Sequence, residues 1–245
     1  MLYPSRALVI IPTYNERENL CHLVPAIFAV DPRLHILVID DASPDRTAEA
    51  VCEMQKEGCD TKLFLLSRPG KMGLGSAYIQ GFKWGLERKY DFLIQMDADW
   101  SHNPGDLARM LRLANEYDFV VGSRYIAGGG TVNWGIWRKL ISRSAGIYSR
   151  LVLRSGFADF TGGFNGWSDE VLEAIRPEML RSDGYSFQIE LKYRADRLGF
   201  THAEFPIVFT ERRSGKSKMS FAIALEACWR VWQFRFKHRN GPRKF

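Results

Sequence analysis

Five short runs of apolar residues alternate with longer stretches of helical periodicity over the first 122 positions of the chain. These runs are predicted strands and cover residues 7–11, 35–40, 63–66, 92–96 and 118–122. Because almost every position in them is apolar, we expect the strands to be buried on both faces. Strands that alternate with helices form parallel sheets with right-handed crossovers. The pattern therefore predicts an α/β fold with a mostly parallel, Rossmann-like sheet flanked by helices.

Two turns are predicted to begin helices, because each places proline directly after a polar residue that can cap a helix. Ser43 precedes Pro44 in the first turn, and Asn103 precedes Pro104 in the second.

The pattern is looser beyond residue 122. Three consecutive glycines at 128–130 indicate a flexible loop. Helical stretches are expected near residues 138–153 and 185–198, and a last strand over residues 205–209.

The composition excludes several classes of protein. With 46% apolar and 25% charged residues, the chain is neither disordered nor fibrous. Its 245 residues suit a single α/β domain, so we expect residues 1–219 and the C-terminal segment 220–245 to belong to one domain. The four cysteines form no CxxC pair, which argues against a zinc ribbon and favours buried thiols in a reducing compartment.

The N-terminal residues lack the basic and apolar regions of a signal peptide, and no run of about 18 apolar residues occurs. We therefore expect a cytoplasmic protein. The net charge of +6 suits an anionic partner, such as nucleic acid, a nucleotide, a phospholipid or a phosphorylated substrate. Charge alone does not choose among these partners.

Acidic residues follow two of the predicted strands, at the edge where parallel sheets bind ligands. Asp40 and Asp41 follow one strand, and Asp97 and Asp99 follow another. Carboxylates that converge on one edge repel each other unless a cation or a ligand rich in donors lies between them. Their oxygens suit Mg²⁺ or Mn²⁺ and leave positions for phosphate oxygens. We expect a divalent cation here, and the alternative is a pair of aspartates that only form turns or cap helices.

Basic residues could neutralise a phosphate at the same edge. Arg124 follows the fifth strand, and a loop that contains Arg212 and Lys218 follows the last one. Metal and cations together suit a nucleotide diphosphate, whereas a solvated charge run is the alternative for the loop. The glycines at 73 and 75 complete neither a dinucleotide fingerprint nor a P-loop, so a turn that opens a helix is expected there.

Six motifs occur in a characteristic order along the chain. They are PTYNEREN at 12–19, DDASPD at 40–45, GLGSAY at 73–78, DADWSH at 97–102, GSRY at 122–125 and the basic loop at 212–218. Together they resemble the dolichol- and polyprenol-phosphate mannosyltransferases, which are inverting members of glycosyltransferase family 2 with the GT-A fold. The resemblance implies a catalytic domain that transfers mannose from GDP-mannose to a dolichyl or polyprenyl monophosphate. A polyprenyl-phosphate glucosyltransferase that uses UDP-glucose would keep nearly every motif and is the alternative.

The same resemblance implies roles for individual residues. The guanosine of the donor would contact Pro12, Tyr14, Glu16, Ile39 and Asp41, with Asp97 and Ala98 beside them. The divalent metal, Mg²⁺ or Mn²⁺, would be held by Asp99, with Ser101 in the position where several relatives have Gln. The donor phosphates would meet Arg124, Arg212 and Lys218, which with Asp99 form the expected catalytic set. The acceptor phosphate would be received by Arg138 and Ser142.

The C-terminal segment has an apolar stripe and a basic end. On a helix the stripe contains Leu225, Cys228, Trp229, Trp232 and Phe236, and five basic residues without an acid close the chain. A helix packed on the core is one interpretation. For a lipid-linked acceptor, the stripe suits a membrane interface, and we expect peripheral attachment to the cytosolic face, with a separate membrane-anchoring subunit as a possible partner. Nucleic acid is not expected as a partner, because it leaves the acidic sheet edge unexplained.

Overall fold

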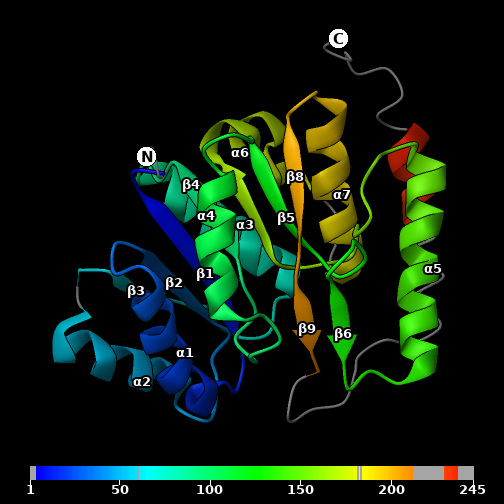
Figure 1. The fold of residues 1–245 in the computed structure, drawn as a ribbon. Coiled ribbons are helices and arrows are strands. Elements are labelled where there is room, and N and C mark those ends of the chain that lie inside the picture. Colours follow the sequence, from blue (N-terminus) through cyan, green and yellow to red (C-terminus); the bar gives the residue numbers. More distant parts are fainter. Residues whose placement is uncertain (1–3, 60, 181, 183, 212–228, 237–245) are drawn as a thin grey trace.

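The computed structural model describes residues 4–59, 61–180, 182, 184–211 and 229–236 of the 245-residue chain. A seven-stranded sheet has the order β3-β2-β1-β4-β7-β5-β8, and helices cover both of its faces (Figure 1). Its strands are β1 (Ala7–Thr13), β2 (His35–Asp40), β3 (Leu63–Ser67), β4 (Phe92–Gln95), β5 (Phe119–Ser123), β7 (Asn165–Ser168) and β8 (His202–Pro206).

Four of the strand pairings in this sheet are parallel, namely β1 with β2, β1 with β4, β2 with β3, and β5 with β8. The prediction of a mostly parallel sheet and the positions of its first five strands are therefore confirmed. The strand β7 lies antiparallel between β4 and β5 and was not predicted. Its sequence contains Gly166, where a Cβ atom would lie 2.4 Å from the ring of Phe92, so only glycine fits this crowded position.

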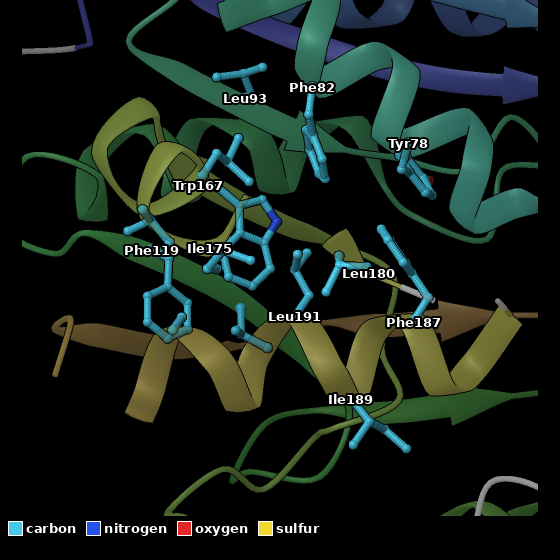
Figure 2. Packing of buried hydrophobic residues seen from close by; sticks show 14 of the residues in the cluster. Tyr78, Phe82, Leu93, Phe119, Trp167, Ile175, Leu180, Phe187, Ile189 and Leu191 are labelled. Carbon is cyan, nitrogen blue, oxygen red and sulfur yellow. The ribbon is translucent and has the colours of Figure 1, made fainter. Parts of the chain in front are cut away.

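Alternate residues of the strands pack on opposite faces of the sheet. Along β1, Leu8 and Ile10 belong to one apolar cluster, whereas Val9 and Ile11 belong to another. The first cluster lies under α3 (Leu74–Glu87), α6 (Asp169–Ile175) and α7 (Gly184–Arg197), and the second lies under α1 (Arg17–Val30), α2 (Thr47–Met54) and α4 (Leu107–Leu113). Figure 2 shows aromatic side chains of the first cluster, in which the rings of Phe119 and Trp167 stack at 5.0 Å. Burial on both faces explains why the strands read as continuous apolar runs.

Only one of the two predicted helix starts is correct. The side chain of Asn103 accepts a hydrogen bond from the N–H of Gly105, and Pro104 begins a single 3₁₀ turn that leads into α4. Ser43, in contrast, caps no helix, because its N–H and hydroxyl both donate to the carboxylate of Asp40. The helix α2 begins only at Thr47.

The second half of the chain departs from the expected pattern in two places. The glycine segment at 128–130 runs into a strand, β6 (Gly130–Val132), and the predicted strand at 205–209 is split between β8 and β9 (Val208–Thr210). The strands β6 and β9 pair in parallel as a small separate sheet. The helix expected near residues 138–153 is confirmed as α5 (Ile136–Leu153), and that near 185–198 is α7.

Two further expectations concern cysteines and membrane spans. Cys21 and Cys52 are exposed, so the prediction of buried thiols is wrong for them, and Cys228 lies outside the described residues. Cys21 lies on α1 and Cys52 on α2, and each helix packs on the sheet with a different face. The local sequence does not determine which face is buried. Within the part of the chain that the structure describes, no helix has the length and apolar character needed to cross a bilayer.

Candidate active site

The turn after β4 presents two carboxylates at the carboxyl edge of the sheet. Asp97 and Asp99 are half-buried, and Ala98 between them is buried. The N–H of Ser101 donates to Oδ1 of Asp99 at 3.1 Å, and Trp100 adopts a left-handed φ of 61° to make this turn. A left-handed conformation at a tryptophan costs on the order of 1–3 kcal/mol, and such strain concentrates at functional sites.

The buried side chain of His102 forms a hydrogen bond to the backbone of this turn. Nδ1 of His102 accepts a hydrogen bond from the N–H of Asp97 at 3.2 Å, and its ring stacks on Phe164. Burial lowers the pKa of His102, although the carboxylates of Asp97 and Asp99 oppose the shift. The ring is therefore a neutral acceptor that positions the turn, and sequence reasoning missed it.

The residues of this turn fit a cation that is shared with a bound phosphate. No group of three or more His, Cys, Asp or Glu side chains within the described residues could hold a metal by itself. Ser101 is buried, and its hydroxyl has no hydrogen-bond partner among the described residues. Mg²⁺ is commonly bound by one or two carboxylates together with substrate phosphates. Asp99 and its neighbour Asp97 supply such carboxylates.

The two carboxylates at the end of β2 already have partners within the protein. Asp40 is buried and accepts hydrogen bonds from Thr13 and Ser43. Asp41 forms a two-pronged ion pair with Arg68, with N–O distances of 2.5 and 2.7 Å. The expectation that all four acids need a cation or ligand is therefore wrong for these two, because hydrogen bonds stabilise Asp40 and the guanidinium of Arg68 balances Asp41.

Arg68 is a site residue that the sequence analysis missed. Its guanidinium also donates to the hydroxyl of Ser76 at 2.7 Å and to the carbonyl of Gly73 at 3.2 Å. It thereby connects the end of β2 to the first turn of α3, where Gly73 has a φ of 92°. Arg68 directly follows β3, so the rule that drew attention to the ends of other strands would have found it.

The residues assigned to the guanosine lie at the ends of β1 and β2. Pro12 pairs with Ile39 in the sheet register, and the side chain of Ile39 is fully buried in the core. Tyr14 is half-buried, with Nζ of Lys71 3.5 Å from the centre of its ring. Glu16 accepts a hydrogen bond from a nearby amide. The aromatic ring and the carboxylate lie at the sheet edge, whereas Ile39 is buried between two strands and is not exposed there.

Arg124 is held in a buried ion pair. Its Nε and Nη2 donate to the two oxygens of Asp159 at 2.7 and 2.8 Å, and Nη2 also donates to the hydroxyl of Thr161. Although burial alone would raise the pKa of Asp159, the charge and hydrogen bonds of Arg124 keep this pKa well below its ordinary value. Arg124 is therefore ion-paired with Asp159. The sequence analysis did not predict this partner.

The loop at 159–163 connects this ion pair to the carboxylates after β4. A Cβ atom on Gly163 would lie 4.0 Å from the carboxylate oxygens of Asp97, so the loop passes directly beside them. Lys192 of α7 is fully buried beneath the loop and donates to the carbonyls of Asp159, Phe160 and Gly162.

Burial of Lys192 is expected to make the free energy of unfolding vary with pH in the alkaline range. Burial lowers the pKa of Lys192 from 10.5 to about 8, although the charge of Asp159 opposes this shift. Between these values the unfolded chain binds more protons, so the free energy of unfolding should rise with pH, by about 1.5 kcal/mol from about pH 8 to about pH 9.5. Urea unfolding should show this rise in the wild type and not in Lys192→Met. An equal rise in both proteins would contradict the assignment.

Arg138 and Ser142 lie one turn apart on the packed face of α5. The hydroxyl of Ser142 accepts a hydrogen bond from Tyr125 at 2.6 Å, and Nη1 of Arg138 donates to Glu211 at 2.5 Å. The guanidinium carbon of Arg138 lies 4.1 Å from the ring centre of Trp134, and that of Arg124 lies 5.5 Å from the same ring. Both guanidinium groups therefore lie near the ring of Trp134.

Three features of this second group were not predicted. They are the hydroxyl of Tyr125, the carboxylate of Glu211 and the buried ring of Trp134. The predicted donor-phosphate residues Arg212 and Lys218 lie outside the described residues, so their roles remain predictions.

Comparisons with known proteins give the family. Residues 8–176 match Glycosyl transferase family 2. The chain is 45% identical over 237 residues to the polyprenol monophosphomannose synthase of Mycolicibacterium smegmatis, which covers 96% of this chain and 89% of that protein. It is 44% identical over 222 residues to the undecaprenyl-phosphate mannosyltransferase of Micrococcus luteus, which covers 91% of this chain and 90% of that protein.

Comparison of structures gives the fold. The mannosyltransferase PcManGT from Pyrobaculum calidifontis, solved in complex with GDP-Man and Mn²⁺, superposes with a TM-score of 0.59 at 19% identity. The match covers 96% of this chain and 74% of that one, in agreement with the expected GT-A fold. Since the family match covers β1 to β7 and the curated relatives match nearly the whole chain, this protein belongs to glycosyltransferase family 2.

Proposed function

We propose that this protein transfers mannose from GDP-mannose to the phosphate of a dolichyl or polyprenyl monophosphate, with inversion at the anomeric carbon. The observation that carries the proposal is the 44–45% identity, over more than nine tenths of the chain, to two proteins named for mannosyl transfer to polyprenyl phosphates. The half-buried carboxylates after β4 and the arginine and serine on α5 provide chemically suitable places for the two phosphate-bearing substrates.

The chain needs no general base for this reaction. A phosphate monoester has a second pKa near 6, so most of the acceptor is a dianion at about pH 7 and is already a nucleophile. The tasks left to the protein are to align two anionic substrates and to stabilise the departing diphosphate. Correct positioning alone can lower the barrier by about 7–11 kcal/mol.

Asp99 would hold the divalent cation, Mg²⁺ or Mn²⁺, with Asp97 beside it and Ser101 as a further oxygen ligand. When bound, the cation would supply Lewis-acid stabilisation of the diphosphate leaving group. Arg212 and Lys218 would contact the same phosphates, and Tyr14, Glu16 and Asp41 would hold the guanosine. Because Arg124 is already paired with Asp159, we assign it a positioning role rather than direct contact with phosphate.

Activity with two donors tests the proposal. Purified protein with polyprenyl phosphate and Mg²⁺ or Mn²⁺ should form a mannolipid from GDP-mannose and little product from UDP-glucose, and a chelator should stop the reaction until metal is restored. Transfer from UDP-glucose instead would favour the glucosyltransferase. No product and no binding of either donor by calorimetry would overturn both assignments.

Arg138 is expected to bind the acceptor phosphate. Replacing it with alanine should raise the KM for polyprenyl phosphate about 10- to 100-fold, the cost of one charge-assisted contact, while the KM for GDP-mannose changes little. Glu211→Gln offers the matched control, because removal of the competing carboxylate should lower the KM for the acceptor. If Arg138→Ala impaired use of the donor instead, Arg138 would belong to the donor site.

The C-terminal residues are proposed to attach the protein to the cytosolic face of a membrane. Three residues of the predicted stripe, Trp229, Trp232 and Phe236, are exposed, and the other two, at 225 and 228, lie outside the described residues. Val231 and Phe234, which were not part of the stripe, pack on the core. Deletion of residues 237–245 removes four basic residues and no acid, so sedimentation with anionic vesicles should fall more than about tenfold. Unchanged sedimentation would exclude a role for the tail, and a wild type that binds only with another subunit would indicate a membrane-anchoring partner.

A further inference from the structure

Three buried carboxamide side chains form a hydrogen-bonded network close to the turn at 97–99. They are Gln95 at the end of β4, Asn165 at the start of β7 and Gln188 on α7, and Gln188 is only 3% exposed. Nδ2 of Asn165 lies 3.0 Å from Oε1 of Gln95 and 3.1 Å from both Oε1 of Gln188 and the carbonyl oxygen of Gly162. A single amide nitrogen, with its two hydrogens, therefore faces three oxygens.

Neighbours that can only donate or only accept set the orientation of these amides. Nε1 of Trp167 is a donor, so the atom of Gln95 that lies 3.0 Å from it is the oxygen. The carbonyl of Gly162 is an acceptor, so it faces the nitrogen of Asn165. Gln188 must then turn its oxygen toward Asn165 and its nitrogen away. This nitrogen, Nε2, is buried and has no hydrogen-bond partner among the described residues.

The unpartnered nitrogen lies near the carboxylate of Asp97. A Cβ atom on Gly163 would lie 3.9 Å from Nε2 of Gln188 and 4.0 Å from both carboxylate oxygens of Asp97. Within the described residues, and apart from the chain neighbours of Gly163, no other atom lies closer to that position. An amide donor and a carboxylate acceptor therefore border the same small space beside Gly163.

Packing of α7 fixes the position of Gln188. Phe187, which precedes it, stacks on Tyr78 of α3 with ring centres 6.3 Å apart (Figure 2), and the hydroxyl of Tyr78 lies 3.4 Å from Oδ1 of Asp97. One turn further along α7, Lys192 donates to three carbonyl groups of the neighbouring loop. The amide and the carboxylate are thus held by the same packed elements.

The chemistry of this pair favours a neutral hydroxyl group as its ligand. The amide N–H of Gln188 would repel a cation, and the carboxylate of Asp97 would repel a phosphate oxygen. A hydroxyl can accept from the amide and donate to the carboxylate at the same time. Carboxylate oxygens accept several hydrogen bonds, so the other contacts of Asp97 leave room for this one. A buried donor without a partner costs free energy, which a bound hydroxyl would recover.

We propose that Gln188 recognises the transferred sugar, with Nε2 donating to one hydroxyl of the hexose and that hydroxyl donating to the carboxylate of Asp97. The inference rests on the proposed function, which brings the mannose of GDP-mannose to the carboxylates after β4. A site built to bind a hydroxyl discriminates strongly against an analogue that lacks it, because its polar groups are then left unpaired. Gln188 would therefore contribute to the choice of sugar and not to the binding of the nucleotide.

Calorimetry with GDP-mannose and its four monodeoxy analogues, each lacking one mannose hydroxyl, tests this contact. One analogue should bind the wild type about 10- to 100-fold more weakly than GDP-mannose does. In Gln188→Met, which keeps the size of the side chain without its amide, that analogue and GDP-mannose should bind equally. GDP alone should bind this variant as it binds the wild type. A penalty as large in Gln188→Met as in the wild type for every analogue, or weaker binding of GDP, would overturn the proposal.

The variant is expected to fold, because loss of Oε1 of Gln188 leaves Asn165 with two acceptors for its two amide hydrogens. Its thermal unfolding midpoint should match that of the wild type. Gln55→Met is the matched control, since Nε2 of Gln55 donates to the carbonyl of Leu63 at 2.8 Å, far along the chain from the proposed contact. This control should show the same penalty for the deoxy analogue as the wild type.

Gly163→Ala provides an independent test. Its methyl group would touch Gln188 and Asp97 at ordinary contact distances, so the fold should tolerate it. Binding of GDP-mannose should weaken about tenfold through crowding of the sugar, while GDP binds as before. Binding of GDP-mannose as tight as in the wild type would show that no hydroxyl occupies this position.

Binding and transfer together separate this inference from the proposed function. Transfer of mannose by a protein whose sugar binding does not depend on Gln188 would overturn only the role of Gln188. Sugar binding that depends on Gln188, in a protein that transfers no mannose to polyprenyl phosphate, would overturn only the proposed function. A wild type that does not bind GDP-mannose would overturn both.

Discussion

Purified Asp99→Ala protein is expected to lose mannosyl transfer by a factor on the order of a thousand or more while keeping its fold. Asp99 is half-buried in the turn after β4, and its carboxylate accepts a hydrogen bond from the N–H of Ser101. Without that carboxylate the proposed cation is no longer held beside the diphosphate. Since the acceptor is already ionised, charge on the leaving group is where the reaction depends most on the protein.

Two measurements separate loss of metal from loss of structure. Asp99→Asn keeps the size of the side chain without its charge and should be equally inactive, whereas Glu116→Ala removes an exposed acid on the surface and should be fully active. Calorimetry should show that Mn²⁺ tightens GDP-mannose binding in the wild type and not in Asp99→Ala. Turnover like that of the wild type in folded Asp99→Ala would refute the metal-binding role.

Asp159→Ala is expected to destabilise the protein by about 3–5 kcal/mol, because it leaves the guanidinium of Arg124 buried without its partner. Asp159 is fully buried and also accepts hydrogen bonds from the N–H groups of Arg124, Thr161 and Gly162. Urea unfolding measures the loss. The matched control is Asp31→Ala, which breaks a surface ion pair to Arg33 and should cost less than about 1 kcal/mol.

The ion pair of Asp159 and Arg124 is also expected to make the free energy of unfolding depend on pH in the acid range. Because the pKa of Asp159 is lowered on folding, its contribution is complete above the ordinary aspartate value of 3.8 and is lost as pH falls below that value. Asp159→Ala should therefore lose less stability than the wild type on acidification. Equal acid sensitivity would show that other carboxylates dominate.

A double variant distinguishes a structural from a catalytic role of Arg124. Arg124→Met with Asp159→Leu replaces the buried pair by apolar groups, which often restores stability. If Arg124 only positions the loop at 159–163, the double variant should recover activity together with stability. Stable but inactive protein would support the contact with donor phosphate that the sequence resemblance implies.

Local sequence determined those features that depend on periodicity and on spacing along the chain. Continuous apolar runs marked five strands correctly, since strands covered on both faces have no polar side. The acidic motif at 97–99 was placed at the sheet edge because parallel strands direct their carboxyl ends to one side. The short strand β7 was missed, because only its neighbours β4 and β5 bury a segment as polar as Asn165–Ser168.

Only the tertiary structure decided how charges are shared and which apolar faces remain exposed. Arg68 neutralises Asp41 from 27 positions away, and Arg124 meets Asp159 from 35 positions away. No local pattern specifies such pairs, because they depend on which loops the sheet brings together. The sequence of α5 has apolar residues on more than one side of the helix, so it does not by itself show which side packs on the protein. Its packed face proved to be the one with Ser142, so the fold itself left the larger side chains of α5 on the outside.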